Sequence, residues 1–152
     1  MVVYELHVDE FNETFEGVVR QLDYLLSLGI NVIEFMPFTN VKEESEWGYT
    51  PLVSPPDECY DIRLGLKILV DACYAKGIAV ILDAVYAHAH PEFAYSLVCK
   101  ATGKLNPMMG YFAGEFFNDP GVDYNKAFAR DYFLTLNKYW LDEYHLDGFR
   151  YD

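Results

Sequence analysis

Hydrophobic and polar residues along this chain follow two alternating spacings. Short, mostly apolar runs at 2–8, 31–36 and 78–82 have the length of buried strands. Between and after them, apolar residues recur at helical spacing in three segments, whose members are Val18, Leu22, Leu25 and Leu26; Ile62, Leu66, Leu69, Val70 and Cys73; and Phe128, Tyr132, Leu136, Tyr139 and Trp140. Thr14 is placed to cap the first helix, and Gly29 and Gly77 to end the first two. With a last strand at 147–152, the predicted order is β-α-β-α-β-α-β.

This order predicts a parallel sheet built from βαβ units. Right-handed crossovers would place the three helices on one side, which leaves the other face of the sheet without a cover. A doubly wound fold would carry a Gly-rich phosphate turn after the first strand, and the chain has none there. The long segments 37–60 and 87–122 are expected to be binding loops, with the charged runs 42–46 and 57–61 solvated. We therefore predict an α/β fold: the first four strands and three helices of a TIM-type (β/α)8 barrel, with residues 1–152 forming its N-terminal half and no second domain.

Composition and charge narrow the range of possible binding partners. The 152 residues are 52% hydrophobic, which indicates a globular chain, and the net charge of −13 disfavours nucleic acid and anionic membranes. The longest apolar stretch, 68–87, is interrupted by charged residues, so no membrane span is expected. Neither a basic leader nor a disulfide-type spacing of Cys59, Cys73 and Cys99 is visible, and we expect a cytoplasmic protein with a neutral substrate.

Candidate catalytic residues gather at the predicted carboxyl ends of strands. Asp83 ends the third strand, with His88 and His90 shortly after it, and Arg150 and Asp152 close the last one. Barrel enzymes assemble their active sites on this rim. Since side chains two residues apart on a strand point the same way, Arg150 should lie beside Asp152 and keep its carboxylate ionised. An ionised carboxylate held in place is a candidate nucleophile.

Sequence motifs at these strand ends carry a family resemblance. An Asp is followed five residues later by a His at 83–88, and residues 148–152 read Gly-Phe-Arg-Tyr-Asp. With Tyr-Glu-Leu-His-Val at 4–8, Leu-Asp-Tyr-Leu at 22–25 and Trp-Gly-Tyr at 47–49, the whole chain resembles the α-amylase family of glycoside hydrolases, family 13. It is most similar to the branch that contains glycogen branching enzymes, isoamylases and maltooligosyltrehalose trehalohydrolases.

The resemblance implies an enzyme that acts on α-glucans or maltooligosaccharides with retention at the anomeric carbon, by hydrolysis or by glycosyl transfer. Asp152 would be the nucleophile that forms a covalent β-glycosyl intermediate, and Arg150 would keep it charged and aimed. Such enzymes need a second, protonated carboxyl group about 5 to 5.5 Å away. His88 would donate to a sugar hydroxyl and Tyr49 would stack on the same sugar. The implied substrate-binding residues are Asp83, His88, Tyr49 and Trp47.

Two departures from the family pattern lead to further expectations. Ala87 stands where the family often has a calcium-binding Asn, and because a methyl group offers no oxygen ligand we expect no metal, and no cofactor, at this site. The family's acid Glu and third catalytic Asp have no counterpart in residues 1–152. We therefore expect the 152-residue polypeptide alone to be inactive. The open half-barrel is expected to self-associate through its strand edges and apolar face.

Other interpretations of the same residues stay open at this point. Arg150 and Asp152 could form a surface ion pair of little energetic weight, Asp83 could cap the loop after its strand, and Trp47 and Tyr49 could be loop-packing aromatics. The His88–His90 pair, with Asp83 and Asp152, could bind a divalent metal in a barrel hydrolase. A rival of another class is a non-catalytic carbohydrate-binding or interaction relic of the enzyme.

Overall fold

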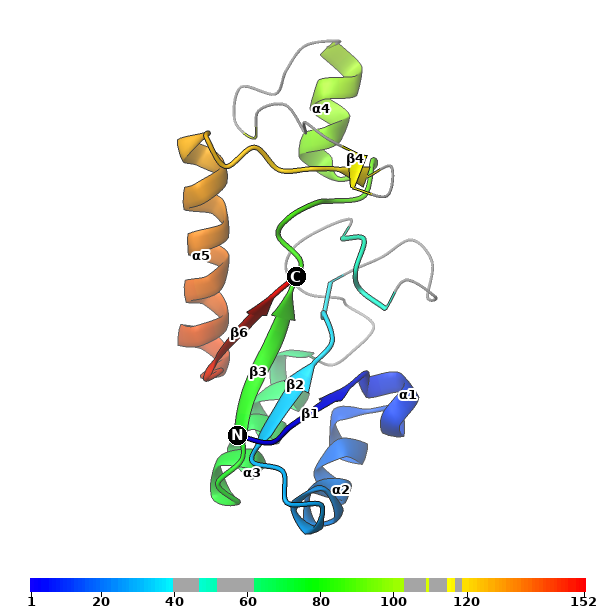
Figure 1. Cartoon of the computed structure of the whole chain (residues 1–152), viewed down its shortest axis with the longest axis vertical. Helices are drawn as coiled ribbons and strands as arrows, with labels where there is room; N and C mark the ends of the chain where they lie inside the picture. The colour runs from blue at the N-terminus through cyan, green and yellow to red at the C-terminus, as the bar shows by residue number, and fades with distance from the viewer. Residues whose placement is uncertain (40–46, 52–61, 103–108, 110–114, 117–118) are drawn as a thin grey trace.

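A computed structural model describes residues 1–39, 47–51, 62–102, 109, 115–116 and 119–152. Its main sheet has four parallel strands in the order β1-β2-β3-β6 (Figure 1). Their bounds are β1 Val3–Leu6, β2 Val32–Phe35, β3 Ala79–Ala84 and β6 Gly148–Tyr151. All four strands overlap the segments predicted as strands, and β3 extends two residues beyond the run at 78–82. A parallel sheet whose spatial order follows the chain order is the start of a (β/α) barrel, so the predicted fold class is confirmed.

The three expected helices are present, and further elements accompany them. The helices and turns are α1 Val8–Asn12, α2 Phe15–Ser27, the π-helical turn η2 Ile62–Leu66 that leads into α3 Lys67–Ala75, α4 Ala94–Thr102 and α5 Ala127–Tyr144, and a small antiparallel pair is formed by β4 Glu115–Phe116 and β5 Asp119–Pro120. The periodicity did not predict α1, α4 or the β4–β5 pair. In the described part of the chain, no helix has both the length and the apolar character that a membrane crossing requires.

Local sequence signals end the helices as expected. The Thr14 side chain accepts a hydrogen bond of 3.0 Å from the backbone N–H of Gly17 at the start of α2. Gly29 and Gly77 have φ angles of +80° and +71° after α2 and α3, in the left-handed region that glycine adopts most easily. Val8, which the alternation places in the first strand, instead begins α1, and the chain turns away from the sheet two residues earlier than expected.

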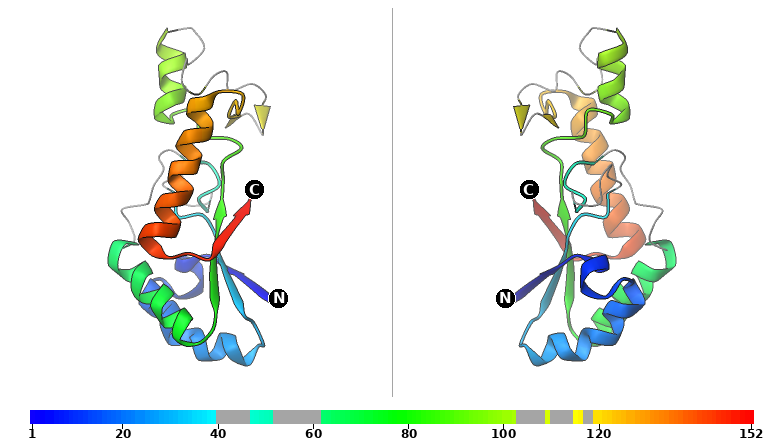
Figure 2. Two further views of the ribbon diagram at one scale, coloured as in Figure 1. Left: turned by 90° about the vertical axis from the view of Figure 1, so that its left-hand side faces the viewer. Right: turned by 90° about the vertical axis from the view of Figure 1, so that its right-hand side faces the viewer.

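The helices cover one face of the sheet. Figure 2 shows α2, α3 and α5 on the same side, as right-handed crossovers require. The strand residues that point toward them are buried and form the core with the helices; these are Leu6, Ile33, Phe35, Val80 and Leu82. On the opposite face Glu5 is exposed and Glu34 and Ile81 are half-buried. Among the described residues, that face has no helical layer.

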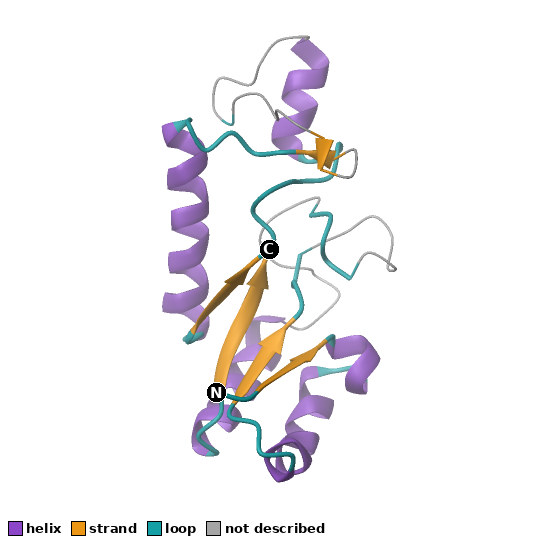
Figure 3. Cartoon of the chain, viewed as in Figure 1, coloured by secondary structure: helices purple, strands orange, loops and turns teal. Residues whose placement is uncertain are grey.

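The carboxyl ends of the four strands lie at the same end of the sheet (Figures 1 and 3). The described residues that directly follow β2 and β3 continue from this end, and α4 and the β4–β5 pair lie beyond it. The charged runs 42–46 and 57–61, expected to be solvated, lie outside the described residues. The fold thus brings the ends of β3 and β6 to the rim where the sequence places its candidate residues.

A carboxylate at the opposite end fixes β6 against β3. The Asp147 side chain accepts a 2.7 Å hydrogen bond from the backbone N–H of Val80, and the Asp147 N–H donates to the Val80 carbonyl at 2.8 Å. The strand that follows pairs Leu82 with Phe149 and Asp83 with Arg150. Asp147 therefore helps to set the register that the candidate site depends on.

Candidate active site at the carboxyl ends of the strands

Asp83 is the buried anchor of the site. It is the penultimate residue of β3, with 1% of its surface exposed, and the strand register pairs it with Arg150 on β6. One guanidinium nitrogen of Arg150, Nη1, contacts Asp83 Oδ1 at 3.1 Å and Oδ2 at 3.0 Å. A buried carboxylate is costly unless it is paired and hydrogen-bonded, and Arg150 supplies the pairing. Asp83 thus ties β3 to β6 through side chains as well as backbone.

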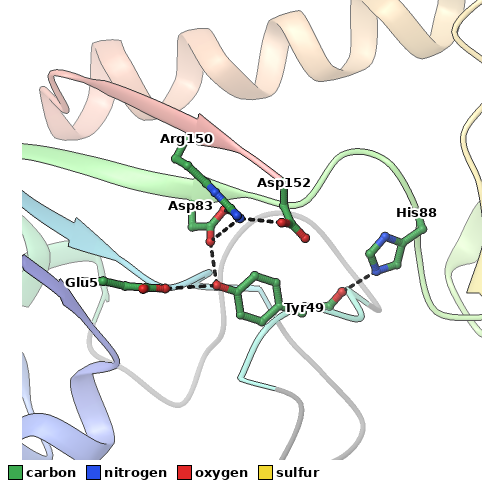
Figure 4. Close-up of polar contacts among 6 residues, drawn as sticks. All are labelled: Glu5, Tyr49, Asp83, His88, Arg150 and Asp152. Carbon is green, nitrogen blue, oxygen red and sulfur yellow. Dashed lines mark hydrogen bonds and ion pairs between the residues drawn. The ribbon is translucent and has the colours of Figure 1, made fainter. Parts of the chain in front are cut away.

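Asp152 lies next to the same guanidinium. Arg150 Nη1 contacts Asp152 Oδ1 at 2.6 Å, and the Asp152 backbone N–H donates to the Ala84 carbonyl at 3.3 Å (Figure 4). The hydrogen bond to Asp83, together with the charges of the two nearby carboxylates, raises the pKa of Arg150 above its usual range, so the cation is permanent. Arg150 therefore holds two carboxylates at once, one buried and one at the open rim.

Tyr49 reaches the same cluster from the loop after β2. Its hydroxyl donates a 2.6 Å hydrogen bond to Asp83 Oδ2 and lies 3.5 Å from Glu5 Oε1 (Figure 4). Burial, and then the bond to Asp83, raise the pKa of Tyr49 well above its usual value of 10.0. The hydroxyl therefore stays a proton donor over the whole working range of pH, and its bond to Asp83 holds the Tyr49 ring beside Arg150 and Asp152.

His88 holds the backbone of this loop. The side chain is buried, and its Nε2 lies 2.7 Å from the Tyr49 carbonyl oxygen. Since a carbonyl oxygen only accepts, Nε2 carries the proton. His90 is engaged elsewhere: its Nδ1 accepts from the Glu92 N–H at 3.1 Å. The structure thus brings His88 to Tyr49, and the expected bond from His88 to a sugar hydroxyl stays a prediction.

Trp47 lies two residues before Tyr49, at the edge of the site. Its indole N–H donates a 2.7 Å hydrogen bond to Glu10 Oε1 on α1, and 45% of its surface is exposed. The sequence motif Trp-Gly-Tyr singled out Trp47, but nothing in the sequence pattern linked it to Glu10, which is 37 positions away.

Two acidic residues of the site were missed at the sequence level. Glu5 on β1 and Glu34 on β2 are register partners, and their carboxylate oxygens and one of Asp83 all lie within 4.8 Å of one another. Burial, then the charges of Asp83 and Glu5, raise the pKa of Glu34 above 4.5. A Glu in the middle of each of two apolar strands was the available signal.

The placement of the acidic and histidine side chains bears on the metal-hydrolase alternative. Within the described ranges, the set of three or more acidic, His or Cys side chains close enough to share an ion is Glu5, Glu34 and Asp83. Neither His88 nor His90 belongs to it. The pair therefore gives the histidine-based metal centre no geometric support in the part of the chain that is described.

The arrangement combines a parallel (β/α) sheet, a rim carboxylate paired with a permanent cation, and aromatic side chains on a loop beside it. Glycoside hydrolases of the barrel class attack sugars with carboxylates placed in this way. Comparison with known proteins gives the family. Residues 12–115 match the family described as "Alpha amylase, catalytic domain", and the chain belongs to the α-amylase family of glycoside hydrolases.

Relatives with known names agree with this assignment. Malto-oligosyltrehalose trehalohydrolase of Saccharolobus solfataricus is 36% identical over 160 residues, an alignment that covers 100% of this chain and 27% of the relative. Isoamylase 1 of Arabidopsis thaliana chloroplasts is 30% identical over 193 residues, covering 100% of this chain and 25% of the relative. The chain therefore spans about a quarter of the length of these relatives.

Solved structures agree on the fold. The α-amylase of Anoxybacillus superposes with a TM-score of 0.85 at 20% identity, over 99% of this chain and 40% of that one. The α-amylase of H. orenii gives 0.84 at 20% identity, over 99% and 39%. At this identity the likeness establishes the fold, and the roles of individual residues are argued below.

Proposed function

We propose that residues 1–152 form the first half of a (β/α)8 catalytic domain that cleaves or transfers α-glucosidic bonds with retention of configuration. Asp152 is the nucleophile in this proposal. The observation that carries it is the Arg150 guanidinium, whose Nη1 lies 2.6 Å from Asp152 Oδ1 while it is also held by Asp83. A carboxylate beside a permanent cation stays ionised, and an ionised oxygen on the rim can attack a sugar's anomeric carbon.

In this proposal the reaction consists of two displacements at the anomeric carbon, C1. An Asp152 oxygen donates an electron pair to C1 as the bond from C1 to the leaving oxygen breaks, and the leaving oxygen takes a proton from a carboxylic acid. Water or an acceptor hydroxyl then attacks C1, loses its proton to the same group, and releases Asp152. We expect that acid from a strand next to β6 in the complete barrel. The 152-residue polypeptide alone is accordingly expected to be inactive.

The other site residues hold the reacting parts in place. Asp83 holds the Arg150 guanidinium in place through its carboxylate. Tyr49, whose hydroxyl is bonded to Asp83, presents its ring to the apolar face of the reacting sugar. His88 keeps the Tyr49 backbone in position. Positioning of this kind matters because a displacement of about 1 Å at the reacting centre can cost a factor of about 100 in rate.

The substrate class in this proposal is an α-glucan or maltooligosaccharide. Two relatives support it, since one is named a malto-oligosyltrehalose trehalohydrolase and the other an isoamylase. The net charge of −13 suits an uncharged polysaccharide better than a polyanion.

The deciding experiment uses the protein together with whatever residues continue it in its natural reading frame. Asp152→Asn is compared with Asp142→Asn, the same change at an exposed position of α5. On amylose and maltoheptaose, reducing-end release and branch formation are both measured. We expect Asp152→Asn to lose roughly 1,000-fold or more in kcat, while Asp142→Asn keeps the parental value.

A second measurement tests the covalent step. With a fluorinated glucosyl fluoride, the glycosyl-enzyme intermediate forms faster than it is hydrolysed. This reagent should add one glycosyl mass to the peptide that contains Asp152. Label on another residue, or turnover by Asp152→Asn at the parental rate, would remove Asp152 from the role of nucleophile. Binding of maltoheptaose with no turnover in any form would instead favour the non-catalytic carbohydrate-binding alternative.

A further inference from the structure

The turn that carries Trp47 is held in a conformation that its residues do not favour. Trp47 has a φ of +49°, in the left-handed region that side chains other than glycine rarely adopt, and Gly48 follows with +89°. A Cβ on Gly48 would come within 2.4 Å of the Pro37 carbonyl oxygen, so only glycine fits there. Left-handed backbone at a non-glycine residue costs about 1 kcal/mol or more and persists where the surroundings over-determine it. Such sites often serve binding.

Glu10 is one of the groups that determine this conformation. It lies on α1, just past the carboxyl end of β1, and accepts the indole N–H of Trp47 at 2.7 Å. A hydrogen bond to an ionised acceptor is roughly twice as strong as a neutral one. The Thr39 hydroxyl, which donates to the Gly48 carbonyl, holds the next peptide group. The indole is therefore fixed to a helix outside its own loop.

This anchoring leaves the indole ring ready for a ligand. The indole N–H, the one polar group of the Trp47 side chain, is already bonded to Glu10, and 45% of the residue's surface is open to solvent. The electron-rich face of an aromatic ring attracts the slightly positive C–H groups on the apolar face of a pyranose. A ring that is already immobilised loses little conformational entropy when it binds.

We propose that Glu10 is a positioning residue that fixes Trp47 as a platform for a second glucose unit, next to the unit that Tyr49 receives. The inference rests on the proposed function, in which Trp47 contacts the substrate, and adds the residue that positions its ring. Trp47 and Tyr49 belong to one short segment, which is anchored at three points: the indole N–H to Glu10, the Tyr49 carbonyl to His88 and the Tyr49 hydroxyl to Asp83. These three hydrogen bonds tie the segment that carries both aromatic rings to residues outside it.

The test is a double-mutant cycle in the protein with its natural continuation. Glu10→Ala and Trp47→Phe each remove one side of the hydrogen bond, and Glu10→Gln keeps an acceptor oxygen. We expect Glu10→Ala and Trp47→Phe each to raise KM for maltoheptaose roughly three- to tenfold, with kcat changed less than twofold. Glu10→Ala should add nothing in a Trp47→Phe background, and Glu10→Gln should stay within twofold of the parent.

A readout without ligand accompanies the kinetics. The fluorescence of Trp47 is obtained as the difference between a protein and the same protein carrying Trp47→Phe. Acrylamide should quench this signal more strongly in Glu10→Ala than in the parent, because the freed ring becomes more accessible. Glu16→Ala is the matched control, since it removes an exposed carboxylate on α2 that accepts a hydrogen bond from Arg20 of the same helix. It should change neither quenching nor KM. Circular dichroism of each variant verifies that it folds.

The outcomes separate this inference from the proposed function. If the protein hydrolyses α-glucan and Glu10→Ala has the parental KM, the proposed function stands and the platform is rejected. A loss of kcat at unchanged KM also overturns it, because a platform acts on binding. Maltoheptaose binding that depends on Glu10, in a protein without turnover, supports the platform and rejects the proposed catalysis. Equal quenching in Glu10→Ala and the parent rejects Glu10 as the anchor.

Discussion

Asp83 and Arg150 are register partners on β3 and β6, and the nitrogen of Arg150 that bonds Asp83 also bonds Asp152. The buried carboxylate thus holds the cation, and the cation holds the rim carboxylate. Replacing any one of the three side chains should therefore change the position of the other two.

Replacing Arg150 with Lys should show this coupling. Lysine keeps the charge but is a point cation on a flexible stem, and it cannot hold two carboxylates with the same geometry. We expect kcat on maltoheptaose to fall by roughly 100-fold. The free energy of unfolding should fall by about 1 to 2 kcal/mol, less than the roughly 3 to 5 kcal/mol of a fully buried pair, because Arg150 is itself 46% exposed. Arg130→Lys, at an exposed position of α5, is the control. Activity within twofold of the parent would contradict the bridging role.

Glu34 should make stability depend on pH. Its pKa is raised in the folded chain, chiefly by burial and then by Asp83 and Glu5, so folding favours its neutral form. The stabilisation linked to neutral Glu34 is fully present below the unfolded value near 4.5 and is lost as pH rises through the folded pKa. Glu34→Gln, which is always neutral, should therefore melt higher than the parent at pH 7.

The sign of the Glu34 effect gives its own check. The difference in Tm between Glu34→Gln and the parent should shrink toward zero as the pH falls below the unfolded value of 4.5. Glu16→Gln, at an exposed position that pairs with Arg20, provides the comparison. A difference that stays constant from pH 4 to pH 7 would show that Glu34 does not titrate with a raised pKa.

Asp147 should matter for stability although it is far from the rim. Asp147→Ala leaves the buried N–H of Val80 without its side-chain acceptor, and an unsatisfied buried donor costs about 1 to 3 kcal/mol. Chemical denaturation should show a loss of this size. Asp142→Ala, an exposed change on α5, should stay within about 0.5 kcal/mol of the parent. Equal midpoints for the two variants would exclude the proposed clamp on the register.

Gly48 should tolerate no side chain. Alanine there adds the penalty of a left-handed backbone and a Cβ contact of 2.4 Å with the Pro37 oxygen. Gly29→Ala is an unusually clean control, since Gly29 has a φ of +80° and open space around its Cβ position. We expect Gly29→Ala to cost about 1 kcal/mol, and Gly48→Ala to cost more and to raise KM for maltoheptaose. Equal costs would show that the Pro37 contact relaxes freely.

The 152-residue polypeptide by itself should self-associate. Within the described residues, β1 and β6 each have one strand partner, and the face of the sheet opposite α2, α3 and α5 has no helical layer. An apolar pocket of about 470 Å³ lies against β6, lined in part by Tyr86, Phe133 and Tyr151. Open edges and apolar surface template association. Since the net charge of −13 opposes it, association should increase with salt in sedimentation velocity. A monodisperse monomer at all salt concentrations would contradict this.

Much of the fold follows from the local pattern, and its failures have local causes. The four strands and the helices α2, α3 and α5 have enough residues for a spacing to be recognised. The helix α1 has 5 residues, too few to show a helical period, and Val8 continues the alternation of the strand before it. The helix α4 lies inside a long connection, where no strand pattern frames it.

By itself, the sequence determined the order of the elements and the placing of Asp83, Arg150 and Asp152 at strand ends, because apolar spacing and turn-forming glycines act over a few residues. Only the tertiary structure decided that one guanidinium joins two carboxylates, that Glu5 and Glu34 approach Asp83, and that Glu10 holds Trp47. Those contacts depend on the register between parallel strands and on the path of loops between residues far apart in the chain, and no local spacing encodes either.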